Sequence, residues 1–327
     1  MSEFDLIARY FTRPAQPPGR AALGVGDDCA LLRLTPGMQL AVSSDMLVEG
    51  RHFFADVDPA ALGHKALAVN LSDLAACGAA PLAFTLALAL PRADEAWLAP
   101  FSRGLLALAD GHGCELVGGD TTQGPLNLCI TVFGEVPPGQ ALLRSGAQAG
   151  DDVYVSGTLG DARLALQALR GSLKLPADLL AQARIRLEQP TPRVALGQAL
   201  RGIASAAIDV SDGLLGDHGH LLKQSGVGAR IDTSIAINLI AASTYSNWAG
   251  GIISSQKQLE CVLAGGDDYE LAFSAPPSAR EAVQAASRQA GTPVTRIGRI
   301  EAEPGLRLVD GDGKLLAGRF ASFDHFA

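Results

Sequence analysis

Aspartates beside small residues recur at five places along this 327-residue chain. The five motifs are GVGDDCA at 24–30, SSDM at 43–46, VGGDT at 117–121, DVSDG at 209–213 and GGDDYE at 265–270. Each follows an apolar run, so we expect each to be a strand that ends in a small-residue turn carrying a carboxylate. α/β proteins place ligand-binding groups at such positions. A single Gly-Asp turn occurs in many loops, whereas five in one chain indicate a functional site.

A sixth aspartate, Asp73, lies in a segment that predicts a helix. Asp58 is an N-cap followed by the first-turn proline Pro59, and Gly78 closes the helix after about Cys77. The apolar stripe of this helix comprises Leu62, Ala66, Val69, Ala76 and Cys77. Asp73 falls within that stripe, and a carboxylate facing a core must be hydrogen-bonded, protonated or paired with a cation. It could cap a nearby loop, but we favour a metal ligand.

The residue types of these motifs predict which metal they bind. Aspartates with Ser and Thr hydroxyls beside them, and no His or Cys partners, describe an all-oxygen site. Such a site suits Mg²⁺ first, and then Mn²⁺ or Ca²⁺. The net charge of −8 argues against a nucleic-acid partner. It does not argue against ATP, because acids that hold several divalent cations attract a polyphosphate.

Several familiar site motifs are absent from the sequence. Gly313 and Lys314 lack the upstream glycine and the following hydroxyl of a P-loop, and Cys29 stands where a dinucleotide-binding turn would have its third glycine. Protein-kinase signatures, HExxH and a nucleophile elbow do not occur either. Arg144 could contact a polyphosphate, although a lone arginine is more often a surface residue.

The composition indicates a soluble protein of two domains. The length exceeds that of one hydrophobic core, and 48% hydrophobic with 18% charged residues can bury sizeable cores. The weakly polar stretch 79–90 is too short to span a bilayer, and residues 1–11 do not resemble a signal peptide. We therefore expect a cytoplasmic protein with no membrane partner. Five cysteines without a CxxC pair predict neither a disulfide framework nor a structural zinc site.

The order of patterns predicts a mixed α/β fold in both halves. The expected helices beside that of Asp73 are 3–11 and 93–111, and the expected strands include 82–90, 129–136 and 152–156. The stretch 137–150 is rich in Pro, Gly and small residues and is the best candidate for a boundary. It gives two domains, 1–140 and 141–327.

Together the motifs resemble one family, the thiamine-monophosphate kinases. They occur in that family's order and read GVGDDCA, SSDMLVEGRHF, KALAVNLSDLAACGA, VGGDTTQG, LLRSGAQAGDDVYVSGTLG, AIDVSDGL and GGDDYEL. The resemblance implies the two-domain α/β fold of the aminoimidazole ribonucleotide synthetase superfamily. It also implies a homodimer whose N-terminal sheets pair into a barrel, with domain 1–140 binding ATP and Mg²⁺. The implied activity is phosphorylation of thiamine monophosphate by ATP, which gives thiamine diphosphate.

The resemblance further implies the roles of individual residues. Several Mg²⁺ ions would be held by Asp28, Ser43, Ser44, Asp45, Asp73, Asp120, Asp209 and Asp212. The catalytic acids would be Asp45, Asp73, Asp120 and Asp212. ATP would contact Gly119, Asp120, Arg144 and Ser211, and thiamine monophosphate would contact His52, Asp267 and Phe320. Asp267 stands where the family usually has Glu, and Phe320 where it often has Trp. Asp27 and Asp268 are assigned no contact.

The acceptor in such a reaction is a phosphate monoester with a second pKa of about 6. Its oxygen is mostly ionised at neutral pH, so alignment and charge neutralisation by Mg²⁺ and Arg144 suffice without a strong base.

Two alternatives to this kinase stay open. Another ATP-using member of the superfamily is one, although a selenophosphate synthetase needs a Cys or selenocysteine and a Lys near its N-terminus, and the first lysine here is Lys65. A hydrogenase-maturation factor needs a C-terminal cysteine, and this chain ends in Phe326-Ala327. The second alternative is a non-catalytic protein that binds divalent cations or nucleotides.

Overall fold

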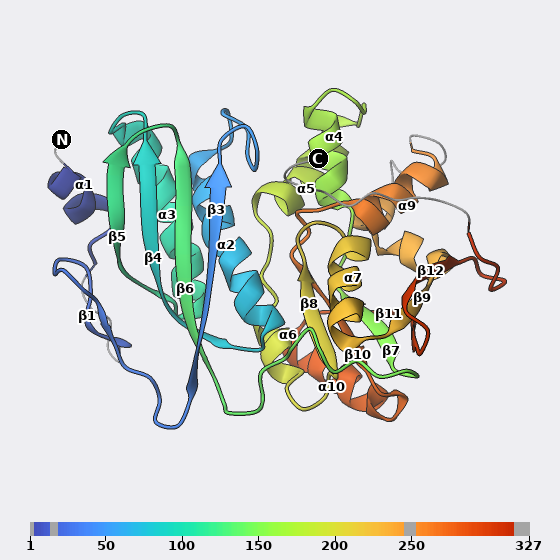
Figure 1. Cartoon of the computed structure of the whole chain (residues 1–327). Helices are drawn as coiled ribbons and strands as arrows, with labels where there is room; N and C mark the ends of the chain where they lie inside the picture. The colour runs from blue at the N-terminus through green and yellow to red at the C-terminus, as the bar shows by residue number, and fades with distance from the viewer. Residues whose placement is uncertain (1–2, 14–18, 245–252, 317–327) are drawn as a thin grey trace. The chain divides into compact units, whose positions relative to one another are not determined.

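The structure is a computed structural model that describes residues 3–13, 19–244 and 253–316 (Figure 1). The chain divides into two compact units. Unit 1 comprises Met1–Leu74 and Ala79–Gly139, and unit 2 comprises Ala75–Gly78 and Gln140–Ala327. Both units combine helices with β-sheet, which confirms the expected mixed α/β class.

Unit 1 is built on a four-stranded sheet in the order β3-β6-β4-β5. This part of the chain forms α1 (Glu3–Tyr10), β1 (Ala21–Leu23), β2 (Leu31–Leu32), β3 (Gln39–Val48), α2 (Pro59–Ala76), β4 (Ala80–Leu90), α3 (Glu95–His112), β5 (Glu115–Gln123) and β6 (Asn127–Val136). Strands β4 and β5 are parallel, and the other neighbours in this sheet are antiparallel. Helices α2 and α3 lie on one face of the sheet (Figure 1).

Helix α2 begins and ends close to where the sequence predicts. Asp58 Oδ1 accepts a hydrogen bond from Ala61 N at 2.9 Å, as an N-cap does. Gly78 follows the helix with a φ of 67°, the left-handed conformation that closes many helices. Leu62, Ala66 and Val69 of the predicted apolar stripe are buried, but Leu67 and Leu71, which lie off the stripe, are also fully buried. The helix is therefore enclosed on more than one side.

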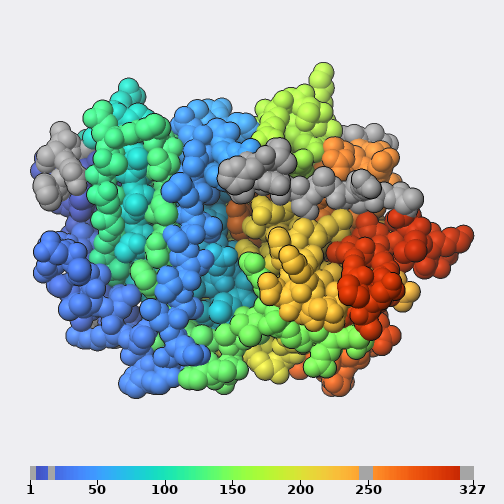
Figure 2. Space-filling model, in the orientation of Figure 1, coloured from blue at the N-terminus to red at the C-terminus, as the bar shows by residue number. Residues whose placement is uncertain are grey.

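Strand β3 leaves one of its faces apolar and exposed. Alternate residues of a strand point to opposite faces, and Ser43 faces α2 because its hydroxyl bonds Asp73 of that helix. The even-numbered positions therefore lie on the face away from the helices. The exposed apolar residues of that face are Leu40 (47%), Val42 (55%), Met46 (55%) and Val48 (37%). Strand β3 is the blue band of atoms at the surface of unit 1 in Figure 2.

Unit 2 is built on a six-stranded sheet in the order β12-β9-β11-β7-β10-β8. Its strands are β7 (Asp152–Ser156), β8 (Ala206–Val210), β9 (Gly228–Asp232), β10 (Glu270–Ala275), β11 (Val294–Glu301) and β12 (Gly305–Val309). Its α-helices are α4 (Asp161–Leu169), α5 (Ala177–Glu188), α6 (Val194–Ala199), α7 (Leu214–Ser225), α8 (Thr233–Ala236), α9 (Ser255–Ala264) and α10 (Arg280–Ala290), and its short 3₁₀ turns are η1 (Ile237–Leu239), η2 (Ala241–Thr244) and η4 (Pro277–Ala279).

The core of unit 2 lies on one face of this sheet. Val153 and Val155 of β7 pack there in one apolar cluster with buried residues of α4, α5, α7 and α9. The residue between them, Tyr154, points to the other face and stacks on Phe273 of β10, with ring centroids 5.2 Å apart. Within the described residues, no helix of either unit is long and apolar enough to cross a bilayer.

Candidate active site

Strand β3 and helix α2 place three predicted site residues on one side of the unit 1 sheet. Ser43 Oγ donates a hydrogen bond to Asp73 Oδ2 at 2.5 Å. Asp45, two residues further along β3, points to the same side. Because β3 is an edge strand, its outward N–H groups need other acceptors, and Asp45 N donates to Asn70 Oδ1 at 3.1 Å. Asp73 therefore contacts β3, and its role as a metal ligand stays a prediction.

Ser44 and Asp120 do not join these residues within unit 1. Ser44 lies on the opposite face of β3, where its hydroxyl is 3.0 Å from Thr131 Oγ1. The strand register aligns Asp45, Ile130, Leu86 and Gly119 in one row across the sheet. The strand that carries Asp120 is thus three strand spacings from β3, roughly 14 Å along the sheet. Two carboxylates that share one Mg²⁺ lie roughly 4 Å apart, so Asp45 and Asp120 do not share an ion within one unit.

Three of the acidic motifs differ from the expected strand-then-turn arrangement. SSDM (43–46) lies inside β3 and VGGDT (117–121) inside β5, while GGDDYE (265–270) follows helix α9 and precedes β10. Strands β3 and β5 are the two edges of their sheet, which is why they can carry polar residues along their length. Gly119 has a φ of 146°, and a Cβ there would lie 1.9 Å from Leu86 O, so this position of β5 requires glycine.

Two further predicted residues of unit 1 lie in turns. Asp28 is exposed, and its N–H donates to Asp27 Oδ1 at 2.8 Å, so Asp27 shapes the turn that presents Asp28. His52 Nδ1 accepts a hydrogen bond from Val48 N at 2.9 Å. The neutral imidazole therefore carries its proton on Nε2.

In unit 2, two acidic loops meet beyond the end of β8. Asp209 lies in β8, and Ser211 and Asp212 form the turn that follows. Asp267 N donates to Ser211 O at 2.8 Å, which joins the loop 265–269 to this turn. The structure therefore brings Asp267 close to Ser211 and Asp212, although these residues are far apart in the sequence.

The second loop has an unusual backbone. Asp267 and Tyr269 have φ values of 67° and 51°, in the left-handed region that residues other than glycine enter only at a cost. The loop is held there by Tyr269 N, which donates to Val210 O at 2.8 Å, and by Tyr269 OH, which is 3.4 Å from Asp267 Oδ1. Strained backbone of this kind is concentrated at functional sites.

Asp217, which the sequence analysis missed, builds the first loop. Its Oδ2 accepts hydrogen bonds from the N–H groups of Ser211, Asp212 and Gly213, each at 3.0 Å. Asp217 lies in the first turn of α7 and is 5% exposed, and this burial raises its pKa to about 7. The sequence does contain one signal for this role. Asp217 is an acid in the first helical turn directly after DVSDG, and a helix favours an anion at that position.

A buried charged cluster supports the second loop. Glu270 is fully buried and accepts hydrogen bonds from Arg186 (2.7 Å), Arg193 (2.6 Å) and Ser156 (2.6 Å). Asp268, also fully buried, accepts from Gly160 N with both of its oxygens at 3.0 Å, and burial raises the pKa of its carboxyl. These contacts fix the backbone that directly follows Asp267.

The other predicted residues are less defined by the structure. Arg144 is exposed, and its backbone oxygen accepts a hydrogen bond from Ser225 Oγ at 3.0 Å. Phe320 lies outside the described residues. Within the ranges that are described, no group of three or more His, Cys, Asp and Glu side chains is arranged to hold a metal ion. The predicted ligands are divided between the two units.

Comparison with known proteins defines the class of this fold and site. Residues 26–136 match the family described as AIR synthase related protein, N-terminal domain. Residues 148–311 match AIR synthase related protein, C-terminal domain. The two matches together define an AIR synthase related protein.

Full-length relatives define the particular family. The chain is 46% identical over 327 residues to thiamine-monophosphate kinase of Salmonella typhimurium, which covers 99% of this chain and 98% of that protein. The crystal structure of thiamine-monophosphate kinase from Stenotrophomonas maltophilia K279a has a TM-score of 0.81 and 44% identity over 96% of each chain. AaThiL complexed with AMPPCP and TMP has a TM-score of 0.76 and 29% identity over 90% of this chain and 89% of that chain. The chain belongs to the thiamine-monophosphate kinases.

Proposed function

We propose that this protein transfers the γ-phosphoryl group of ATP to the phosphate of thiamine monophosphate. The observation that carries the proposal is the 46% identity to a thiamine-monophosphate kinase over 99% of the chain. The complex of AaThiL with AMPPCP and TMP supports it. An oxygen of the acceptor phosphate forms the new bond to phosphorus, and the bond from that phosphorus to the ADP oxygen breaks. The products are thiamine diphosphate and ADP.

The joined loops of unit 2 suit this chemistry because the acceptor needs no strong base. A phosphate monoester has a second pKa of about 6, so its attacking oxygen is already ionised at neutral pH. The main requirements are alignment of two polyanions and neutralisation of their charge. Ser211 would contact ATP and Asp267 would contact thiamine monophosphate, and the hydrogen bond between their backbones fixes the distance between the two contacts. Asp217 and Glu270 keep this pair of loops in place.

The donor groups fit Mg²⁺. The proposed ligands are Asp28, Ser43, Ser44, Asp45, Asp73, Asp120, Asp209 and Asp212, all of which offer oxygen. Ser43 Oγ and Asp73 Oδ2, 2.5 Å apart, are close enough to occupy neighbouring positions on one ion. Bound Mg²⁺ would neutralise phosphate charge and orient both substrates. Gly119 and Arg144 would complete the contacts to ATP, and His52 and Phe320 those to thiamine monophosphate.

A product analysis tests the proposed reaction. The protein is incubated with ATP, MgCl₂ and thiamine monophosphate, and the thiamine phosphates and ADP are separated by chromatography. Thiamine diphosphate and ADP are expected in equal amounts, with neither formed when the acceptor is omitted or replaced by thiamine. ADP without thiamine diphosphate would contradict the acceptor. Binding of ATP without turnover would instead favour a non-catalytic binding protein.

We also propose that the active species is a homodimer. The exposed apolar face of β3, with Val42 and Met46 each 55% exposed, suits burial against a second copy of unit 1. We place this dimer in the cytoplasm, a compartment that suits the five free cysteines.

The dimer is tested by sedimentation of Met46→Glu. A charge on the buried face should give monomers and remove most of the turnover. Ile185→Glu is the matched control, because Ile185 is 57% exposed on α5 of unit 2. A Met46→Glu variant that sediments as the wild type would contradict the assignment of this face.

A further inference from the structure

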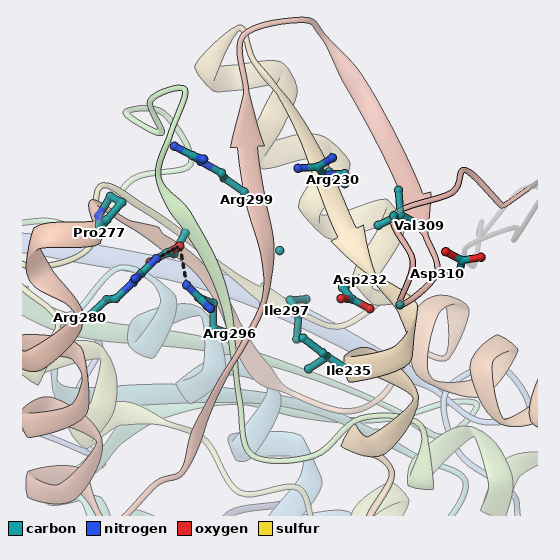
Figure 3. Close-up of a pocket in the computed structure, with 14 residues that line it drawn as sticks. Arg230, Asp232, Ile235, Pro277, Arg280, Arg296, Ile297, Arg299, Val309 and Asp310 are labelled. Atoms are coloured by element: carbon teal, nitrogen blue, oxygen red, sulfur yellow. Dashed lines mark hydrogen bonds and ion pairs between the residues drawn. The ribbon is translucent and has the colours of Figure 1, made fainter.

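A cavity of about 540 Å³ lies in unit 2 beside strands β9 and β11 (Figure 3). Four arginines line it, namely Arg230 on β9, Arg280 at the start of α10, and Arg296 and Arg299 on β11. The chain carries a net charge of −8, so four guanidinium groups around one cavity run against its overall charge. None of the lining residues is among the predicted active-site residues.

Two of these arginines face each other across neighbouring strands. Arg299 and Arg230 are directly opposite in the β11–β9 register, and Arg307 of β12 is opposite Arg230 on its other side. Like charges in such positions destabilise a sheet. Arg230 Nε is 3.6 Å from Glu301 Oε1, but Glu301 is shared with Arg307, whose Nη1 lies 3.3 Å from its other oxygen. Arg299 donates to Gly150 O at 3.3 Å and forms no ion pair with any described residue.

The other two arginines are positioned by one buried carboxylate. Asp152 accepts from Arg280 Nε at 2.6 Å and Nη2 at 2.9 Å, and from Arg296 Nη1 at 3.3 Å. The side chain of Asp152 is 4% exposed, whereas those of Arg280 and Arg296 are 51% and 50% exposed. One carboxylate against two guanidinium groups leaves a net positive charge. Asp152 therefore orients the pair toward the cavity without neutralising it.

The opposite side of the cavity is acidic. Figure 3 shows Asp232 and Asp310 on the side away from Arg280 and Arg296, with Ile235 below them. Each aspartate is fixed through one oxygen. Asp232 Oδ1 accepts from the first turn of α8 at 2.9 Å, and Asp310 Oδ1 accepts from two N–H groups of its own turn at 3.0 and 2.9 Å. The cavity thus has a cationic side, an anionic side and an apolar wall.

We propose that this cavity is a binding site for an organic diphosphate whose heterocycle carries an amino group. Arginine forms bidentate, charge-assisted hydrogen bonds with phosphate, and two pairs of arginines suit two phosphoryl groups. Asp232 and Asp310 accept from the amino group or pair with a cationic ring, and Ile235, which is 38% exposed, contacts the ring face. The volume lies in the range of small-molecule sites. Thiamine diphosphate and ADP both have this chemistry.

Equilibrium dialysis of the intact protein with radiolabelled thiamine diphosphate, and separately with ADP, tests the site. The variant is Arg230→Gln/Arg299→Gln, and the control is Arg307→Gln, which changes the next arginine in the same row. Wild type and control should show two classes of site. The double variant should lose one class, or bind it at least about tenfold more weakly, with kinase turnover unchanged. Identical binding curves for all three proteins would overturn the proposal.

A second variant tests the ligand class and does not depend on the arginines. Asp310→Asn keeps the oxygen that holds its own turn and removes the charge. It should weaken binding of the labelled ligand at the cavity and leave competition by inorganic diphosphate unchanged. The labelled compound that binds more tightly to the cavity, thiamine diphosphate or ADP, is the ligand of the site. Equal weakening of both compounds and inorganic diphosphate, or binding of inorganic diphosphate alone, would show that the cavity does not recognise a heterocycle.

Discussion

Asp217 should control both the stability of unit 2 and the rate of the reaction. Its one oxygen accepts three backbone hydrogen bonds of the turn 211–213, each at 3.0 Å. A hydrogen bond to a charged group contributes about 1.5–3 kcal/mol, but burial of this carboxylate, visible in its pKa of about 7, offsets part of the total. We therefore expect Asp217→Ala to lower the free energy of unfolding by about 3 kcal/mol. Asp217→Asn, which keeps an acceptor, should lower it by about 1 kcal/mol.

The same substitution should slow turnover because the turn carries Ser211 and Asp212. A shift of about 1 Å in a positioned group can reduce a rate about 100-fold, and we expect a loss of that order in kcat/KM for Asp217→Ala. Urea unfolding followed by circular dichroism gives the stability, and a coupled ADP-release assay gives the rate. Glu281→Ala is the control, because Glu281 lies in the first turn of α10 but is exposed. Turnover of Asp217→Ala within twofold of wild type would refute the reasoning.

Three further predictions concern the metal, the acceptor and the pH dependence. Asp73→Asn should weaken Mn²⁺ binding at least about tenfold, measured by electron paramagnetic resonance of the free ion, and unchanged binding would remove Asp73 from the ligands. Asp267→Ala should raise the KM for thiamine monophosphate and leave that for ATP nearly unchanged; equal effects would place Asp267 outside the acceptor contact. Arg280 holds the pKa of Asp152 below its ordinary value of 3.8. The ion pair therefore stabilises the fold above that pH, and this stabilisation is lost as the pH falls through the lowered pKa. Asp152→Asn should therefore cost about 1 kcal/mol at pH 7, with the arginines half exposed, and the difference from wild type should shrink at pH 3; a constant difference would contradict this assignment.

Local signals in the sequence were sufficient to predict much of the fold. Asp58 and Gly78 predict the limits of α2 because capping depends on a few neighbouring residues. Apolar runs predict β4 and β6 in nearly the right places. The full burial of Leu67 and Leu71 in α2 was not predictable in the same way, because burial depends on the packing of distant segments, which no local pattern specifies.

For the candidate site, less could be predicted from the sequence. Asp45 and Asp120 are both carboxylates, which suggests a shared metal. Their separation, however, depends on strand order, which places them at opposite edges of one sheet. Asp217 was missed because an acid in a first helical turn also occurs in many ordinary helices. Its role depends on the direction of three N–H groups in the preceding turn. That direction is a property of the folded backbone and has no signal of its own in the sequence.

The left-handed backbone at Asp267 and Tyr269 bears on how this protein can change by mutation. Glycine adopts such φ values without the steric cost that both residues bear, so glycine at either position would relieve strain. Glycine at 267 would also remove the carboxylate proposed to contact the acceptor, and glycine at 269 would remove a ring that is 9% exposed. A laboratory selection that rewards heat resistance alone would therefore favour glycine at 267, whereas one that rewards growth without supplied thiamine diphosphate would reject it. At this loop, selection for thermal stability and selection for enzymatic activity would therefore favour different residues.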